Sequence, residues 1–136
     1  MPRRIVDISA PLKAGIASDP RGHEPQIVYR DHQDRIWVTV STRLVPRRPA
    51  ATTPSHDGYI LLIADGQARI VAEGLCFTNE LRVDAAGRYL YVAETSLRRI
   101  SRYTIATDGS LHDKIPYGPG DLGGRPDGIA LDVDGN

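Results

Sequence analysis

Residues 79–88 read NELRVDAAGR and lead directly into YLYVA at 89–93, a short run of aromatic and aliphatic side chains. The same ten-position frame occurs twice more, as QIVYRDHQDR at 26–35 and as DGIALDVDGN at 127–136. Each copy opens on a polar residue, has an aspartate five positions later, and carries a turn-forming pair eight and nine positions later. In the first copy, IWVTV at 36–40 takes the place of YLYVA. The chain therefore contains an internal repeat.

The spacing of the repeat indicates the architecture. Its copies begin at residues 26, 79 and 127, which are 53 and 48 residues apart. Repeats of about 40–50 residues that are built from short strands are typical of β-propeller blades. One four-stranded blade cannot bury both of its faces alone, so neighbouring blades must cover each other. The repeat predicts an all-β fold made of successive four-stranded antiparallel blades.

The sequence between the repeats favours strands over helices. GYILLI at 58–63 and QARIVA at 67–72 flank an Asp-Gly pair at 65–66, which is the preferred two-residue hairpin turn because both residues tolerate positive φ. A second Asp-Gly pair at 108–109 follows the strand-like segment RISRYTI at 99–105. No long run has the 3.6-residue period of an amphipathic helix, so helix is expected to be a minor component.

Composition narrows the class of protein. The 136 residues include 17 basic and 17 acidic ones, so no large field of one sign is available to attract nucleic acid or an anionic membrane. The longest strongly apolar run is far shorter than the roughly 20 residues of a membrane span, and the N-terminus does not resemble a signal peptide. The single cysteine, Cys76, lies in an apolar run and is expected to be a small buried residue without a catalytic base. These features predict a soluble cytoplasmic protein with no nucleic-acid or membrane partner.

Two stretches carry a family resemblance. FTNELRVDAAGRYLYVAET at 77–95 and RPDGIALDVDGN at 125–136 resemble the senescence marker protein, gluconolactonase and luciferin-regenerating enzyme family. DRIWVTVSTR at 34–43 is similar to an earlier blade of its bacterial members. The resemblance covers about residues 25–136 and implies part of a six-bladed β-propeller. About half of such a ring is expected here, as an incomplete gluconolactonase-like domain.

The resemblance also implies a function and its residues. Members of the family hydrolyse sugar-type or related lactones with one divalent metal near the propeller axis. By motif, Asn79 matches one asparagine ligand and Asp127 matches the aspartate ligand, which is also expected to activate water as the catalytic residue. The second asparagine falls at Gln26, whose side chain is longer by one methylene. The family's glutamate ligand has no counterpart in this sequence.

The residue types agree with that chemistry. Amide and carboxylate oxygens are hard ligands that suit calcium best, with magnesium, manganese or zinc as other candidates. A cation at the axis could polarise a lactone carbonyl while Asp127 activates water. The competing interpretation is that Asn79 and Asp127 only cap tight turns before their strands.

The first 24 residues suggest a different origin. RIVDISAPLKAGIASDP at 4–20 resembles the opening of the metal-dependent cyclase family, which includes arylformamidases. The metal signature of that family, His-x-Gly-Thr-His-x-Asp, is absent, and the four histidines are too scattered to rebuild it. Residues 1–24 are therefore expected to be a cyclase-like leader and not a domain. An ordinary N-terminal strand and loop is the alternative.

Three functions stay open at the level of sequence. The first is a metal-dependent lactone hydrolase that acts on a carboxylic ester bond of a small-molecule lactone. The second is a non-catalytic propeller segment that acts through protein–protein contacts, and the third is a cyclase-type amide hydrolase. An incomplete ring would leave strand edges open, so self-association is expected, together with weak metal binding and hydrolysis near background.

Overall fold

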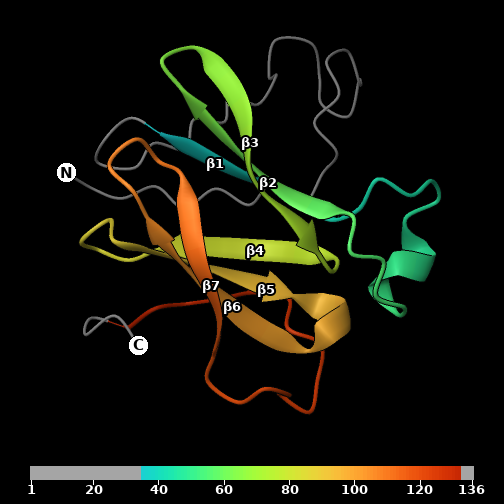
Figure 1. Ribbon diagram of the computed structural model, residues 1–136. Helices are drawn as coiled ribbons and strands as arrows, with labels where there is room; N and C mark the ends of the chain where they lie inside the picture. Colours follow the sequence, from blue (N-terminus) through green and yellow to red (C-terminus); the bar gives the residue numbers. More distant parts are fainter. Residues whose placement is uncertain (1–34, 133–136) are drawn as a thin grey trace, which may run out of the picture.

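In the computed structural model, residues 35–132 are described, and they form two antiparallel sheets that face each other (Figure 1). The first sheet contains β1 (Ile36–Val40), β2 (Gly58–Ala64) and β3 (Gln67–Leu75). The second contains β4 (Thr78–Val83), β5 (Tyr89–Glu94), β6 (Arg99–Ile105) and β7 (Leu111–Tyr117). Two short 3₁₀ helices, η1 (Arg48–Ala51) and η2 (Thr95–Leu97), complete the described part, which holds no α-helix. The all-β prediction is confirmed, and no helix within residues 35–132 could cross a membrane.

Both predicted Asp-Gly turns close hairpins. Asp65 and Gly66 have φ values of 51° and 72° between β2 and β3, whose pairing ends at Ala64 opposite Gln67. Gly109 has a φ of 80° in the turn between β6 and β7. Positive φ at these positions costs glycine nothing, so the turn sequence fixes where each hairpin reverses.

The second sheet is a simple meander in the order β4-β5-β6-β7. Its first strand lies within the ten-position frame, with Asn79 as the second residue of β4. The repeated aspartate, Asp84, follows this strand, and its Oδ1 accepts hydrogen bonds from the backbone N–H groups of Arg88 (2.6 Å) and Tyr89 (2.9 Å). The frame thus encodes one strand, a turn capped by aspartate, and the start of the next strand.

The first sheet matches the last three strands of the second. Ile36, which begins β1, and Tyr89, which begins β5, both lie ten positions after the start of their repeat. By their order along the chain, β2 and β3 then correspond to β6 and β7. In the ten-position frame, the residues equivalent to β4 are 25–30, which lie outside the described residues. The four-stranded sheet has the form of one blade, and the three-stranded sheet matches its last three strands.

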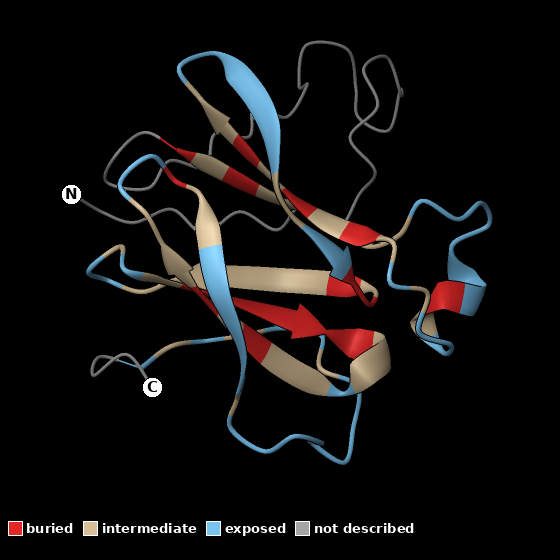
Figure 2. Cartoon of the chain, viewed as in Figure 1, coloured by how far each residue is buried: buried red, intermediate tan, exposed pale blue. Residues whose placement is uncertain are grey.

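The hydrophobic core lies between the two blades. Figure 2 shows buried segments along β2 of the first sheet and β5 of the second. The core cluster draws on both sheets and consists of Trp37, Ile60, Leu62, Leu75, Leu90, Val92 and Tyr103. Burial of each large aliphatic side chain contributes about 1.5–3 kcal/mol. Each blade therefore depends on its neighbour for much of its stability.

A buried carboxylate ties the second blade together. Glu94, at the end of β5, is 0 % exposed. Its Oε1 accepts hydrogen bonds from Ser101 Oγ (2.5 Å) and Arg99 Nη2 (3.0 Å) and forms an ion pair with Lys114 Nζ (2.9 Å). Its Oε2 accepts a hydrogen bond from the backbone N–H of Cys76 (3.0 Å). Burial alone would raise the pKa of Glu94, but the hydrogen bonds from Ser101 and Lys114 outweigh it and lower the pKa from 4.5. The ionised form is therefore the stable one in the folded protein.

The turn glycines provide a test of how the blades pack. A Cβ at Gly109 would lie 2.4 Å from Cδ2 of Leu62 in the other sheet, whereas a Cβ at Gly66 meets nothing within 4 Å. Alanine at either position incurs the positive-φ cost of about 1–2 kcal/mol. Because Leu62 is buried, we expect Gly109→Ala to lower the free energy of unfolding by about 1–3 kcal/mol more than Gly66→Ala in urea denaturation. Equal losses would contradict the packing of this turn against Leu62.

The Glu94 network predicts a pH dependence. A carboxylate whose pKa is lowered in the folded state stabilises the protein above its unfolded pKa, near 4.5, and this stabilisation is lost as the pH falls through the folded pKa. Glu94→Gln should lower the free energy of unfolding by about 1.5–3 kcal/mol at neutral pH, because it removes the charged acceptor of the hydrogen bonds from Ser101 and Arg99. It should also reduce the loss of stability that urea denaturation detects between neutral pH and about pH 3.

The matched control for Glu94→Gln is Glu73→Gln. Glu73 forms an exposed ion pair with Arg43 (2.7 Å), and such pairs contribute about 1 kcal/mol or less. A Glu94→Gln variant whose stability declines with acid as steeply as that of the wild type would contradict this account.

Candidate functional site

The two side chains that the repeat places at equivalent positions are in contact. Asn79 lies in β4, and Asp127 lies in the extended segment that follows β7 and returns to this blade (Figure 1). Asn79 Nδ2 donates a hydrogen bond to Asp127 Oδ1, although 48 residues separate them in sequence. Asp127 is exposed and Asn79 is half-buried, so solvent and small molecules can reach the pair.

Backbone contacts hold the Pro-Asp-Gly loop, residues 126–128, against β4. The backbone N–H of Glu80 points to the carbonyl of Asp127 (3.4 Å), and Glu80 Oε2 accepts from the backbone N–H of Ile129 (2.7 Å). A Cβ at Gly128 would lie 3.0 Å from the same Oε2, so the glycine permits this close approach. Arg82 pairs with the other oxygen of Glu80 and keeps its carboxylate in place. Glu80 therefore fixes the loop on the C-terminal side of Asp127.

Hydroxyl groups fix the remaining backbone around the pair. Thr39 Oγ1, in β1, donates to the carbonyl of Asn79 (2.6 Å), and Ser41 Oγ donates to the carbonyl of Thr78 (2.7 Å). Thr95 Oγ1 donates to the carbonyl of Pro126 (2.7 Å). No sequence motif marked these residues as members of the site. The one signal was that Thr39 and Ser41 lie in residues 34–43 and Thr95 in residues 77–95, two segments that resemble the family.

The donor atoms suit part of a hard-cation site. An amide oxygen and a carboxylate are ligands that calcium, magnesium and manganese accept. The amide nitrogen of Asn79 faces Asp127, and a half-turn of the amide would present its oxygen instead. Calcium takes about six to eight oxygens, and the described part of the chain gathers no group of three His, Cys, Asp or Glu side chains that could hold a metal. Asn79 and Asp127 thus fit such a site as two of its ligands.

The other site predictions have separate outcomes. Gln26 lies outside the described residues, so its role as a ligand stays a prediction. The turn-capping interpretation is wrong for Asn79, because this residue lies inside a strand and its amide contacts Asp127. Turn capping falls to other aspartates: Asp84 caps the turn after β4, and Asp108 Oδ1 accepts from the backbone N–H of Ser110 (2.9 Å).

Cys76 is fully buried, as predicted, but a potential base lies beside it. His56 Nδ1 is 3.2 Å from Cys76 Sγ. No sequence motif links the two residues, because they come from different segments 20 positions apart. Burial raises the pKa of the Cys76 thiol, so the thiol remains protonated at neutral pH and is a poor nucleophile. The pair is therefore a hydrogen bond between an exposed histidine and a buried, protonated thiol, and not a catalytic pair.

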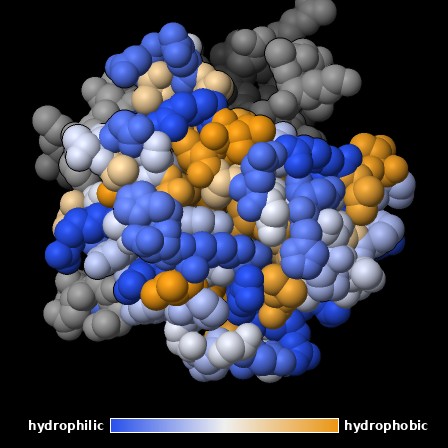
Figure 3. Space-filling model, viewed as in Figure 1, coloured by the Kyte–Doolittle hydropathy of each residue, from blue (hydrophilic) through white to orange (hydrophobic). Residues whose placement is uncertain are grey.

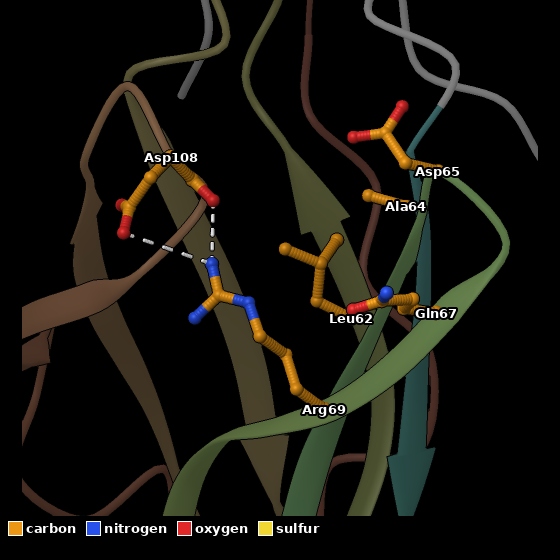
Figure 4. A pocket seen from close by; sticks show the side chains of 6 residues that line it. All are labelled: Leu62, Ala64, Asp65, Gln67, Arg69 and Asp108. Carbon is orange, nitrogen blue, oxygen red and sulfur yellow. Dashed lines mark hydrogen bonds and ion pairs between the residues drawn. The ribbon is translucent and has the colours of Figure 1, made fainter.

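A shallow cavity of about 310 Å³ lies elsewhere, between the hairpin ends of the two blades (Figure 4). The Arg69 side chain reaches across it from β3, and its Nη2 donates to the carbonyl of Asp108 (2.5 Å). Asn79 and Asp127 do not line this cavity, whose lining is Leu62, Ala64, Asp65, Gln67, Arg69 and Asp108. The arginine closes the gap between the blades, and the cavity is separate from the candidate site.

The surface is mainly polar on the face seen in Figure 3, with small apolar patches between charged side chains. The outer strands carry two exposed isoleucines: Ile70 on β3 is 45 % exposed and Ile115 on β7 is 41 % exposed. These are single apolar residues on strand edges and do not form a pocket.

A protein-family model matches most of the chain, including all or nearly all of each repeat. The family model described as "SMP-30/Gluconolactonase/LRE-like region" matches residues 28–136. Comparison with curated proteins gives no significant match. The cyclase-like segment, residues 1–24, lies outside both the matched range and the described residues, so its resemblance stays a prediction.

The structure also resembles a solved enzyme. A luciferin-regenerating enzyme superposes with a TM-score of 0.58 and 18 % sequence identity, over 75 % of this chain and 34 % of that one. At this identity the likeness shows the fold, a β-propeller, and the chain spans about a third of that enzyme's length. Since the family model covers most of the sequence and the two sheets have the form of propeller blades, this chain belongs to the SMP-30/gluconolactonase/LRE-like family.

Proposed function

We propose that this chain carries part of the site of a metal-dependent hydrolase that opens small-molecule lactones. The observation that carries the proposal is the contact between Asn79 and Asp127. These residues occupy the first position of successive repeats, and the family match includes both. The exposure of Asp127 leaves room for a substrate beside it.

In this proposal Asn79 Oδ1 and the Asp127 carboxylate hold a divalent cation, with Gln26 as a third ligand. Calcium is favoured because the donors are hard oxygens, and magnesium, manganese or zinc are the alternatives. When bound, such a cation polarises the carbonyl of the lactone and so makes its carbon more electrophilic.

The residues of the chain then supply binding and proton transfer. With the cation held by the Asn79 oxygen and by one oxygen of Asp127, the other oxygen of the Asp127 carboxylate would accept a proton from water. The water oxygen bonds to the carbonyl carbon, and the ring C–O ester bond breaks. The alkoxide that leaves takes up the proton that Asp127 accepted from water, and the product is an open-chain hydroxy acid. The stoichiometry is one lactone and one water to one hydroxy acid.

A second function, binding of another protein, rests on a different observation. The outer strands β3 and β7 expose Ile70 and Ile115 on edges that have no strand partner among residues 35–132. Unpaired edges can add a strand from another chain. This function requires no cation, so the response to metal separates the two proposals.

The test of the proposed site is the effect of cation on thermal stability. Calcium or manganese should raise the melting temperature of the chelator-treated protein, because a ligand that binds only the folded state stabilises it, by about 2.7 kcal/mol at a concentration about 100 times its Kd. Asp127→Ala should abolish the increase and reduce any lactone hydrolysis, since it removes the carboxylate. Differential scanning calorimetry and a pH-stat assay with a sugar lactone measure the two effects.

The matched control is Asp84→Ala, which removes an aspartate five positions after Asn79. Asp84 caps the turn before β5, so its loss should lower the melting temperature without cation but preserve the increase that cation causes. Equal responses in the Asp127 and Asp84 variants would contradict the ligand role of Asp127.

A further inference from the structure

Each candidate ligand is preceded by a residue whose backbone carbonyl accepts a hydrogen bond from a side-chain hydroxyl. Ser41 is the first residue after β1, and Thr95 is the first residue after β5, which is one residue longer than β1, so Ser41 falls one repeat position before Thr95. Ser41 Oγ donates to the carbonyl of Thr78 at 2.7 Å, and Thr95 Oγ1 donates to the carbonyl of Pro126 at 2.7 Å. Thr78 immediately precedes Asn79, and Pro126 immediately precedes Asp127. Each hydroxyl therefore reaches from one repeat to the residue before the ligand of the next.

We propose that Ser41 and Thr95 are positioning residues that set the direction in which Asn79 and Asp127 present their side chains. This inference rests on the proposed function for its chemical purpose, although the contacts themselves need no metal. We call the pair of hydrogen bonds the hydroxyl latch.

Thr95 has the larger role because it contacts both ligand segments. Its backbone N–H donates to the carbonyl of Phe77 (3.1 Å), two residues before Asn79, while its hydroxyl holds Pro126. Thr95 is only 8 % exposed, so little water competes for these bonds. One residue thus sets the distance between the two segments that carry the candidate ligands.

The two ligands do not depend equally on the latch. Asn79 lies at an irregularity of the β4–β5 ladder, between the paired residues Thr78 and Leu81, and its carbonyl accepts from the Thr39 hydroxyl. Asp127 lies outside any strand, and proline at 126 has no N–H to anchor the loop. The loop therefore relies on Thr95 before Asp127 and on Glu80 after it. Loss of the Thr95 hydroxyl should disturb Asp127 more than loss of the Ser41 hydroxyl disturbs Asn79.

The chain offers a matched control at Thr42. Thr42 lies sixteen positions after the start of its repeat, as Thr95 does, but its hydroxyl donates to the carboxylate of Asp57 (2.7 Å). Thr42→Val therefore removes a side-chain hydrogen bond of the same length, and the acceptor of the Leu44 backbone N–H (3.1 Å), from a threonine whose hydroxyl bonds to neither ligand segment.

The experiment compares Thr95→Val, Thr95→Ser and Thr42→Val in the 136-residue chain. Calorimetric titration with calcium chloride should show an affinity about tenfold lower for Thr95→Val, the effect typical of losing a group that orients a ligand. Thr95→Ser restores the hydroxyl and should bind as the wild type does, and so should Thr42→Val. An affinity for Thr95→Val equal to that of the wild type would overturn the positioning role.

A second measurement tests the latch without metal. In the chelator-treated protein, amide hydrogen exchange at Ile129 should become several-fold faster in Thr95→Val, while exchange at Tyr103 in the core stays unchanged and shows that the protein is folded. Thr95→Ser should retain the slow exchange of the wild type. Unchanged exchange at Ile129 in Thr95→Val, or an equal acceleration in Thr42→Val, would overturn the latch.

The two readouts separate this inference from the proposed function. If the wild type binds no divalent cation, the proposed hydrolase site fails, and exchange at Ile129 alone decides whether the latch holds the loop. If cation binds but Thr95→Val changes neither affinity nor exchange, the latch fails and the proposed function stands.

Discussion

Neither sheet of the described chain can bury its apolar side chains without the other. The packing of the two sheets therefore sets the position of the strands and of the candidate site. Leu62 of the first blade and Leu90 of the second belong to one core cluster, and Gly109 leaves space for the Leu62 side chain at the hairpin end. Once the blades are packed at this distance, β1 lies beside β4. The hydroxyls of Thr39 and Ser41 can then reach the carbonyls of the second blade. The candidate site is therefore a consequence of the core and not an addition to it.

Two consecutive residues at the end of β5 have different roles: Glu94 stabilises the blade, and Thr95 positions the candidate site. The buried carboxylate of Glu94 joins the strands of its own blade through hydrogen bonds and ion pairs with Ser101, Arg99 and Lys114. Thr95 follows it and reaches outward to the segments before Asn79 and Asp127. Because the buried carboxylate fixes the backbone at Glu94, the next residue begins from a defined position. The end of β5 therefore holds the irregular loop at residues 126–128 in place. This loop has no strand pairing of its own to fix its shape.

The sequence was informative wherever the signal was local. Asp-Gly turns and the runs at β1, β2, β3, β5 and β6 were predictable, because turn chemistry and β-branched or aromatic composition act over a few residues. The repeat also predicted that Asn79 and Asp127 occupy equivalent positions, and the structure brings them together. β4 was not predicted as a strand because three of its partly buried residues, Asn79, Glu80 and Arg82, are polar or charged. The hydroxyl contacts and the approach of His56 to Cys76 depend on how segments 20 or more residues apart are packed, which no local pattern encodes. Gln26 and the cyclase-like leader lie outside the described residues and remain predictions.

The contact between Asn79 and Asp127 also constrains how the proposed site would work. With the amide nitrogen toward the carboxylate, Asp127 already has a donor and needs no cation to be satisfied. A cation would require the amide to turn and present its oxygen, and this exchanges a hydrogen bond to a charged group, which contributes about 1.5–3 kcal/mol, for a metal–oxygen contact. Asn79 is fixed in a strand, whereas Asp127 is carried by a loop. The loop at residues 126–128, and not the strand, would therefore move to fit cations of different size. Its hydrogen bonds to Thr95 and Glu80 limit that movement.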